Sequence, residues 1–245
     1  PLLGLGTWKT PGRVDDEEAF EAVKAALDAG YRHFDTAEIY GNEEEVGEAI
    51  KEALFEGSGV VREDIFITSK LWNTFHSPKH VREALEKSLK RLGLDYVDLY
   101  LIHWPDPLKP GDDVPIEETW KALEKLVDEG KVRSIGVSNF SAEQLEEALS
   151  EAGKIPPVVN QVEYHPYLRQ DELRKFCKKH GIGVTAYSPL GSGLLDKFWS
   201  ELGSPELLED PALKKIAEKY GKTPAQVALR WVLQRGVSVI PKSST

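Results

Sequence analysis

"SPKHVREALEKSLKRLGLDYVDLYLIH", residues 77–103, carries the pattern that decides the fold. Ser77 and Pro78 are typical of a helix start, and Gly93 is typical of a helix end. Between them, apolar residues recur at the spacing of one helix face: Val81, Leu85, Leu89 and Leu92. The short apolar run that follows, residues 96–103, predicts a buried strand. A capped amphipathic helix that leads directly into a buried strand indicates a parallel α/β fold.

The same alternation of helix and strand extends over the rest of the chain. Ser141 with Gln144, and Thr223 with Gln226, predict capping boxes at the starts of two further helices. Eight strand-like runs are present, each short and rich in Val, Ile, Leu or aromatic residues: 2–7, 31–36, 64–70, 96–103, 132–137, 157–162, 182–187 and 236–241. Eight such units joined by right-handed crossovers predict a closed (β/α)8 barrel, the TIM barrel, as a single domain over residues 1–245.

Composition and charge exclude several classes of function. The 245 residues carry a formal net charge of -10, which argues against a nucleic acid or an anionic membrane as partner, since such interfaces need excess Lys and Arg. No apolar stretch approaches the roughly 18 residues that span a bilayer. The single cysteine, Cys177, cannot form an internal disulfide, so we expect a cytoplasmic protein. The chain contains no Met, which favours a fragment or a designed or consensus-like sequence.

Polar residues follow the predicted strands at their carboxyl ends, where a barrel of this type carries its chemistry. In chain order they are Asp35, Lys70, His103, Ser138 with Asn139, Asn160 with Gln161, Tyr187 with Ser188, and Lys242 with Ser243. Any one of them has an ordinary structural explanation, as a helix cap or a packed core residue. Together they bring an Asp, a Lys and a His to one barrel mouth, where buried charges must pair. The pattern therefore predicts an active site at this end of the barrel.

Eight segments of the chain, taken in order, resemble the aldo-keto reductase family: "GLGTW", "GYRHFDTAEIYGNE", "ITSKLW", "DLYLIHWP", "GVSNF", "NQVEYHPY", "AYSPLGS" and "IPKSS". The resemblance implies a (β/α)8 barrel that reduces aldehydes or ketones with NADPH and has no Rossmann domain, in agreement with the absence of a complete G-x-G-x-x-G fingerprint. It also implies a small-molecule carbonyl substrate, no metal ion, and a monomer in the full-length form. Relative to the family, we expect this chain to lack the last helix and the N-terminal hairpin.

The resemblance assigns four catalytic residues, and the chemistry explains why they belong together. Reduction of a carbonyl by hydride needs a proton donor, and a phenol with its ordinary pKa of about 10 is a weak acid at neutral pH. By the resemblance, Tyr40 is this general acid. We expect Lys70 to stabilise the Tyr40 anion and Asp35 to keep Lys70 charged, because a lysine desolvated alone would lose its proton. His103 matches the residue that hydrogen-bonds the substrate carbonyl in its neutral form.

The resemblance also assigns residues to NADPH and to the substrate pocket. The matches for the nicotinamide are Ser138, Asn139 and Gln161, which bind its carboxamide, and Tyr187, which stacks on its ring. The matches for the loop over the pyrophosphate are Ser188, Leu190 and Ser192. The matches for the adenosine 2′-phosphate are Lys242 and Ser243. The matches for the wall of an apolar substrate pocket are Trp8, Trp72 and Trp104.

Two functions of other classes compete with carbonyl reduction. A barrel with Lys70 at a strand end is compatible with a Schiff-base aldolase, which needs a neutral, desolvated lysine. The carboxylate of Asp35 argues against this function because it favours the charged ammonium. The other alternative is a non-catalytic NADP(H)-binding barrel, or a designed or consensus barrel without efficient turnover. The complete set of four catalytic residues argues against it.

Overall fold

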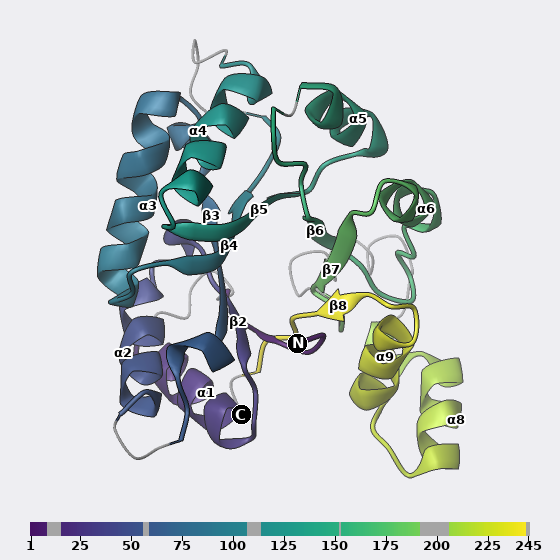
Figure 1. Ribbon diagram of the computed structural model, residues 1–245. Helices are drawn as coiled ribbons and strands as arrows, with labels where there is room; N and C mark the ends of the chain where they lie inside the picture. The colour runs from purple at the N-terminus through teal and green to yellow at the C-terminus, as the bar shows by residue number, and fades with distance from the viewer. Residues whose placement is uncertain (9–15, 56–58, 107–113, 152, 192–205, 244–245) are drawn as a thin grey trace.

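Eight parallel strands form the centre of the protein in the computed structural model, and they lie in the order in which they occur in the chain (Figure 1). The structure describes residues 1–8, 16–55, 59–106, 114–151, 153–191 and 206–243. The strands are β1 Leu5–Gly6, β2 His33–Asp35, β3 Phe66–Leu71, β4 Val97–Ile102, β5 Val132–Ser138, β6 Val159–Glu163, β7 Gly183–Tyr187 and β8 Ser238–Val239. Each strand pairs in parallel with the next, which confirms the predicted strand number and the barrel topology.

The barrel closes where its first and last strands meet. Gly4 N donates to Val239 O at 2.9 Å, and Gly6 N donates to Pro241 O at 3.0 Å. A Cβ atom on Gly6 would lie 2.7 Å from the carbonyl oxygen of Ile240, so only glycine permits this approach. We call these contacts the closing seam.

The strands at the closing seam are shorter than predicted. β1 and β8 have two residues each, where the sequence predicts runs over 2–7 and 236–241. The flanking residues bond across the seam through an isolated bridge and single hydrogen bonds instead of a continuous ladder.

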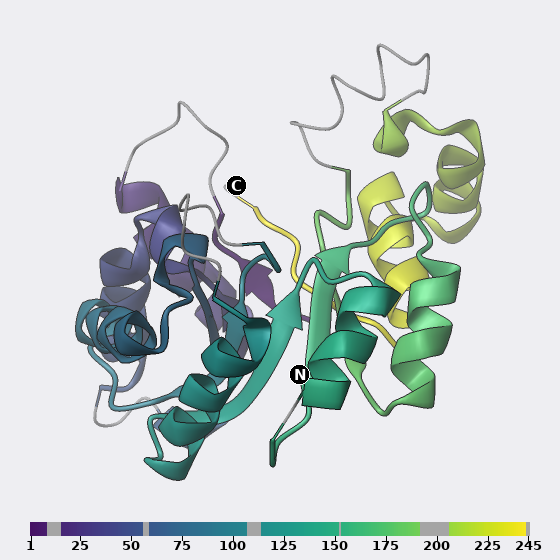
Figure 2. The same cartoon turned by 90° about the horizontal axis from the view of Figure 1, so that it is seen from above.

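Helices cover the outside of the strands (Figure 1). They are α1 Asp16–Asp28, α2 Glu43–Ala53, α3 Pro78–Leu92, α4 Ile116–Asp128, α5 Ala142–Glu151, α6 Asp171–Lys179, α8 Pro211–Tyr220 and α9 Pro224–Leu233. Seen from above, α1 to α4 and the group of α6, α8 and α9 lie on opposite sides of the strands, and the segment after β8 runs back between them (Figure 2). In the described part of the chain, no helix combines the length and the apolar character needed to cross a membrane.

The local helix signals act largely as predicted, with one difference at the start of α3. Gly93 ends this helix in the left-handed region at φ 64°, and both predicted capping boxes are present. Ser77 precedes α3, but its side chain makes no capping hydrogen bond. Its carbonyl oxygen accepts from His80 N at 2.8 Å and from Val81 N at 3.2 Å, so the backbone holds this helix start.

Alternation along the strands separates two apolar layers and positions the polar residues. The large core cluster lies between the strands and the helices, whereas a small cluster fills the barrel interior: Leu99, Leu101 and Val159, with Phe66 packed against them. Because residues two and four apart on a strand share a face, Lys70 lies on the face of Phe66, and Gln161 lies on the face of Val159. Both polar residues are nearer the carboxyl ends, so they sit above the apolar filling.

Candidate active site

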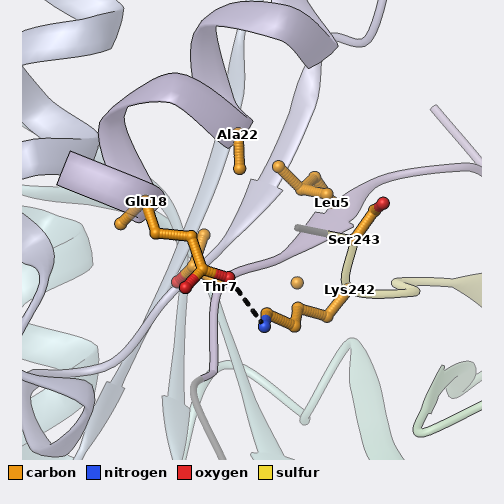
Figure 3. Close-up of a pocket in the computed structure, with 8 residues that line it drawn as sticks. Leu5, Thr7, Glu18, Ala22, Lys242 and Ser243 are labelled. Carbon is orange, nitrogen blue, oxygen red and sulfur yellow. Dashed lines mark hydrogen bonds and ion pairs between the residues drawn. The ribbon is translucent and has the colours of Figure 1, made fainter. Parts of the chain in front are cut away.

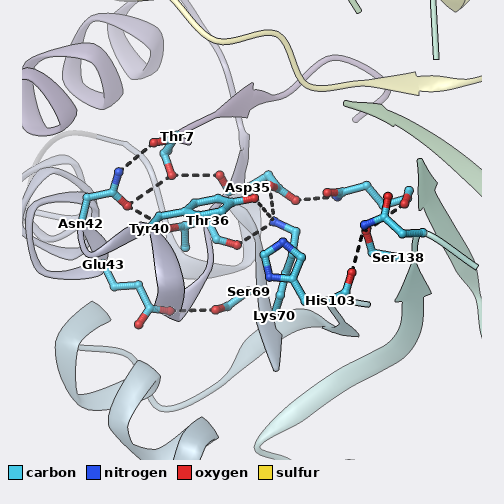
Figure 4. A network of polar contacts seen from close by, with 12 residues as sticks. Thr7, Asp35, Thr36, Tyr40, Asn42, Glu43, Ser69, Lys70, His103 and Ser138 are labelled. Atoms are coloured by element: carbon cyan, nitrogen blue, oxygen red, sulfur yellow. Dashed lines mark hydrogen bonds and ion pairs between the residues drawn. The ribbon is translucent and has the colours of Figure 1, made fainter. Parts of the chain in front are cut away.

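Lys70 is at the centre of the site and is fully buried. Its Nζ donates to Asp35 Oδ1 at 2.5 Å, to Thr36 O at 2.9 Å and to Tyr40 OH at 3.1 Å (Figure 4). An ammonium has three protons, and these three acceptors use all of them. Tyr40 therefore accepts a hydrogen bond from Lys70, and its own hydroxyl proton stays available for another acceptor.

The pKa values of this pair keep both groups protonated at neutral pH. Burial alone would lower the pKa of Lys70, but the Asp35 carboxylate and the Tyr40 oxygen outweigh it and raise the pKa above its ordinary value. Burial also raises the pKa of Tyr40, and the Lys70 charge opposes only part of this rise. Lys70 thus acts on Tyr40 in the expected direction, but burial outweighs it and the net shift of the pKa is upward. Tyr40 therefore stays protonated at neutral pH.

His103 stands beside Tyr40 as a neutral ring. Its centroid is 5.8 Å from that of Tyr40 and 5.2 Å from that of Trp72, and both contacts are edge-to-face. Burial, and then the charge of Lys70, lower the pKa of His103 to about 3. Within the described residues, the buried Nδ1 has no hydrogen-bond partner, and none is found for Nε2. The neutral imidazole is therefore available to a ligand at the barrel mouth.

The buried histidines predict that the protein loses stability in mild acid. Burial lowers the pKa of His33 to about 4 and that of His103 to about 3, both below the ordinary value of 6.5. The unfolded chain then binds more protons below pH 6.5, so the free energy of unfolding falls as the pH drops through that value. Each histidine contributes a slope of up to about 1.4 kcal/mol per pH unit.

Urea denaturation at pH 7, 6 and 5 measures this dependence while the carboxylates stay largely ionised. We expect His33→Asn to flatten it by about half, because one of the two buried rings is removed. Equal unfolding free energies at pH 7 and pH 5 in the unsubstituted protein would contradict the prediction.

Gln161 connects the second half of the barrel to this centre. Its Nε2 donates to Asp35 Oδ2 at 2.7 Å, so both oxygens of the Asp35 carboxylate are hydrogen-bonded. The backbone oxygen of Gln161 accepts from Ser138 Oγ at 2.8 Å. Its side-chain Oε1 accepts no hydrogen bond from the residues that the structure describes. Gln161 thus holds Asp35 with one end of its amide and keeps an acceptor for a ligand.

Asn139 ties three strands together. It follows β5 at φ 65°, in the left-handed region that asparagine tolerates better than most residues. Its Nδ2 donates to His103 O at 3.0 Å and to Ser138 Oγ at 3.1 Å, while its Oδ1 accepts from Tyr187 OH at 2.8 Å. Burial raises the pKa of Tyr187, which keeps this donor protonated. The structure therefore brings the predicted nicotinamide residues together. Both the nitrogen and the oxygen of the Asn139 side-chain amide are already hydrogen-bonded within the protein.

Lys242 lies at the other predicted cofactor position. Its Nζ is 3.2 Å from Glu18 Oε1 of α1, across a small pocket that Thr7 and Ser243 also line (Figure 3). Both partners of this ion pair are partly exposed, so the ammonium is accessible to another anion. The pairing with Glu18 was not predicted, since the two residues are 224 positions apart in the chain.

The remaining predicted residues that the structure describes follow the strands β1, β3, β4 and β7. Ser188 follows β7 at φ 46°, and Leu190 packs on the apolar cluster between α8 and α9. Ser192 lies outside the described residues. Of the three tryptophans, Trp72 contacts the His103 ring, while Trp8 and Trp104 are 38% and 45% exposed.

Asn42 is a buried residue of the site that the sequence analysis did not assign. Its Nδ2 donates to Thr7 O at 2.7 Å, and its Oδ1 accepts from Thr36 Oγ1 at 3.2 Å (Figure 4). It thereby fixes the segment after Tyr40 to β1 and β2. In the sequence, the available signal was its place in "YGNE", two residues after Tyr40. The structure buries Asn42 completely, and a buried amide needs hydrogen-bond partners.

Comparison with known proteins identifies the family of this chain. The family profile described as Aldo/keto reductase family matches residues 2–245. The chain is 51% identical to human aldo-keto reductase family 1 member A1 over 260 aligned positions, which cover 100% of this chain and 78% of that protein. Its identity to the chicken protein of the same name is 50%, with coverages of 100% and 77%, and its identity to the rat protein is 50%, with 100% and 78%. The chain belongs to the aldo/keto reductase family of carbonyl-reducing oxidoreductases.

Proposed function

We propose that this protein reduces aldehydes and ketones to alcohols with NADPH, and that Tyr40 donates the proton. The observation that carries the proposal is the Lys70 ammonium, whose three hydrogen bonds leave the Tyr40 proton free beside the neutral ring of His103. This arrangement supplies a proton donor and a neutral hydrogen-bonding group at one point of the barrel mouth, as carbonyl reduction requires.

The residues present fit NADPH by their chemistry. Gln161 keeps a free amide oxygen for a carboxamide, Tyr187 offers a ring anchored through its hydroxyl, and Lys242 offers an accessible cation for a phosphate. Ser138, Asn139, Ser188, Leu190, Ser192 and Ser243 complete the proposed cofactor set. When bound, NADPH supplies a hydride to the carbonyl carbon.

The protein's own groups prepare and complete the proton transfer. His103, neutral because of its burial, hydrogen-bonds the carbonyl oxygen and orients it. Tyr40 transfers its proton to this oxygen as negative charge develops there, and Lys70 stabilises the phenolate that remains. Asp35 keeps Lys70 charged, and Gln161 holds Asp35 in place. In the reverse direction the Tyr40 phenolate is the base.

Lys70 is a poor candidate for a Schiff base. An aldolase needs a neutral amine with a free lone pair, whereas the pKa of Lys70 is raised by Asp35 and Tyr40 against the effect of burial, and its protons are all engaged. Borohydride treatment in the presence of carbonyl substrates is expected to leave Lys70 unmodified.

The direct test is an assay of the purified protein with NADPH and a panel of aliphatic and aromatic aldehydes and ketones, followed by the loss of nicotinamide absorbance. We expect turnover with several carbonyl compounds and formation of the matching alcohol. NADPH binding without turnover on the whole panel would favour the non-catalytic alternative.

We further propose that the protein works as a cytoplasmic monomer on small-molecule carbonyl compounds, with Trp8, Trp72 and Trp104 at the substrate pocket. The formal net charge of -10 supports the absence of a nucleic-acid or membrane partner.

Cofactor preference provides a prediction for Lys242. A charge-assisted bond from its ammonium to the 2′-phosphate is worth roughly 1.5–3 kcal/mol, so Lys242→Ala should weaken NADPH binding about 10- to 100-fold. NADH lacks this phosphate, and its Kd should change by less than about threefold. Glu18→Gln should tighten NADPH binding, because it removes the carboxylate that now pairs with Lys242. Fluorescence titration with both cofactors measures the effect, and equal losses for the two would place Lys242 outside the phosphate site.

A further inference from the structure

Two glutamates bracket the turn that carries Tyr40, and one arginine on the outside of the barrel holds both. The turn is a short 3-10 helix, η1 Glu38–Tyr40, and α2 starts at Glu43. From α3, Arg91 Nε donates to Glu43 Oε2 at 2.8 Å, and its Nη2 lies 2.7 Å from the same oxygen. The same Nη2 is 3.6 Å from Glu38 Oε1. Arg91 therefore contacts the chain two residues before Tyr40 and three residues after it.

Glu43 connects this arginine to the strand that carries Lys70. Its side chain is 0% exposed, and its second oxygen, Oε1, accepts from Ser69 Oγ at 2.7 Å (Figure 4). Ser69 directly precedes Lys70 on β3, so alternation directs it to the helix side while Lys70 faces the barrel interior. Arg91, Glu43 and Ser69 thus form a continuous chain of contacts on the helix side of β3. Lys70, which binds the Tyr40 hydroxyl, lies on the opposite side of the same strand.

Close packing of two helices makes this contact possible. A Cβ atom on Gly47 of α2 would lie 2.5 Å from the carbonyl oxygen of Leu92 of α3, so the helices approach at a point that only glycine permits. Gly47 is one helical turn after Glu43, and Leu92 is next to Arg91. The approach of the backbones therefore brings Arg91 to Glu43.

Arg91 is the cation that pairs directly with both carboxylates of this cluster. Burial raises the pKa of Glu38, Arg91 opposes that rise, and Glu43 adds to it, so the two carboxylates repel each other across the turn. The hydroxyls that face the cluster are Ser88 Oγ, which is 3.4 Å from Arg91 Nη2, and Tyr100 OH, which is buried without a partner in the described part of the chain. Neither is a cation, and the other positive charge that acts on Glu38 is that of Lys87. Loss of Arg91 would leave the fully buried carboxylate of Glu43 without its counter-ion and would weaken the pairing of the partly buried Glu38, so the turn would have to move to rehydrate Glu43.

We infer that Arg91 is a positioning residue for Tyr40, because it fixes both ends of the turn that carries the phenol. Arg91 itself contacts neither Tyr40 nor Lys70 and acts only through Glu38, Glu43 and, through the latter, Ser69. The inference rests on the proposed function, since it assumes that the place of the Tyr40 hydroxyl decides the rate of proton transfer.

Steady-state kinetics of Arg91→Met and Arg91→Lys test the inference against a matched control. The control is Arg62→Met, which breaks a comparable pair at the opposite end of the barrel, where Arg62 Nη2 lies 2.8 Å from the buried carboxylate of Asp98. We expect Arg91→Met to lower kcat about 10- to 100-fold, because a misplacement of about 1 Å has effects of this size. KM and the Kd of NADPH should stay within about twofold, and Arg91→Lys should restore part of kcat. Arg62→Met should lose stability and keep kcat.

A second measurement does not depend on turnover. In protein labelled with 3-fluorotyrosine, Tyr40→Phe identifies the ¹⁹F resonance of Tyr40. We expect this resonance to shift or broaden in Arg91→Met, and less in Arg91→Lys, while it stays in place in Arg62→Met. If Arg91→Met does not fold, Arg91→Lys alone must displace the signal.

These two readouts separate the inference from the proposed function. A protein that reduces no carbonyl compound with NADPH would refute the proposed function, while a displaced Tyr40 resonance in Arg91→Met would still support the placement of the turn by Arg91. An unmoved resonance and an unchanged kcat in Arg91→Met, with an active unsubstituted protein, would overturn the inference alone. A kcat that falls equally in Arg91→Met and Arg62→Met would also overturn it, because the effect would then be one of general stability.

Discussion

Tyr40→Phe is expected to lower kcat by roughly 10²–10⁴-fold, the usual contribution of a positioned general acid. The aromatic ring remains, so its edge-to-face contact with His103 should persist, while the hydroxyl proton that Lys70 leaves free is removed. The Kd of NADPH should change little, because the residues proposed to hold the cofactor are untouched. Steady-state assays with a good carbonyl substrate, together with cofactor titration, measure both quantities.

Tyr164→Phe is the matched control for this substitution. Tyr164 is fully buried, and its hydroxyl has no hydrogen-bond partner among the described residues, so the loss of that oxygen should leave kcat unchanged. Retention of more than about 10% of kcat in Tyr40→Phe would show that another group donates the proton.

Lys70→Met should abolish turnover and also destabilise the fold by about 3–5 kcal/mol, because the buried carboxylate of Asp35 loses its counter-ion. Lys70 and Asp35 are 0% and 2% exposed, so water cannot replace the missing partner without local opening. The double variant Asp35→Asn, Lys70→Met removes both charges and should regain a large part of this stability without regaining activity.

Urea denaturation of the two single variants and the double variant gives the coupling between Lys70 and Asp35. A positive coupling of a few kcal/mol is expected for a buried pair. If the losses in the single variants simply add in the double variant, the two side chains are not paired as the structure shows.

The position of the proposed catalytic residues could be predicted from the sequence because strand periodicity is local. Asp35, Lys70 and His103 each end an apolar run, and in a parallel barrel all such ends meet at one mouth. The partners of these residues could not be predicted in the same way. The bond from Gln161 to Asp35 joins residues 126 positions apart and depends on the curvature of the sheet, which no local pattern records.

The electrostatics of Tyr40 illustrate a second limit of sequence reasoning. The sequence indicates that a lysine lies near the phenol, and the structure places Lys70 Nζ at 3.1 Å from it. The net direction of the Tyr40 pKa shift depends on how deeply the hydroxyl is buried. Here the rise caused by burial is larger than the decrease caused by the Lys70 charge. In the same way, the sequence predicts the cation Lys242 but not the carboxylate of Glu18 that faces it.

The closing seam has a consequence for the order in which the protein folds. All other neighbouring strands are consecutive in the chain, whereas the seam joins segments as distant as Leu2 and Ser238, which are 236 positions apart. Contacts at such separation form late, after the local helix and strand units, because the entropy of the longest loop must be overcome. Thr7 and Asn42 join the neighbouring β1 and β2 units, so this anchor of the Tyr40 turn forms with the pairing of those strands, whereas Gln161, 126 positions from Asp35, reaches that carboxylate only when the sheet has curled. During refolding, the helical circular dichroism signal should therefore return before the Tyr40-dependent activity does.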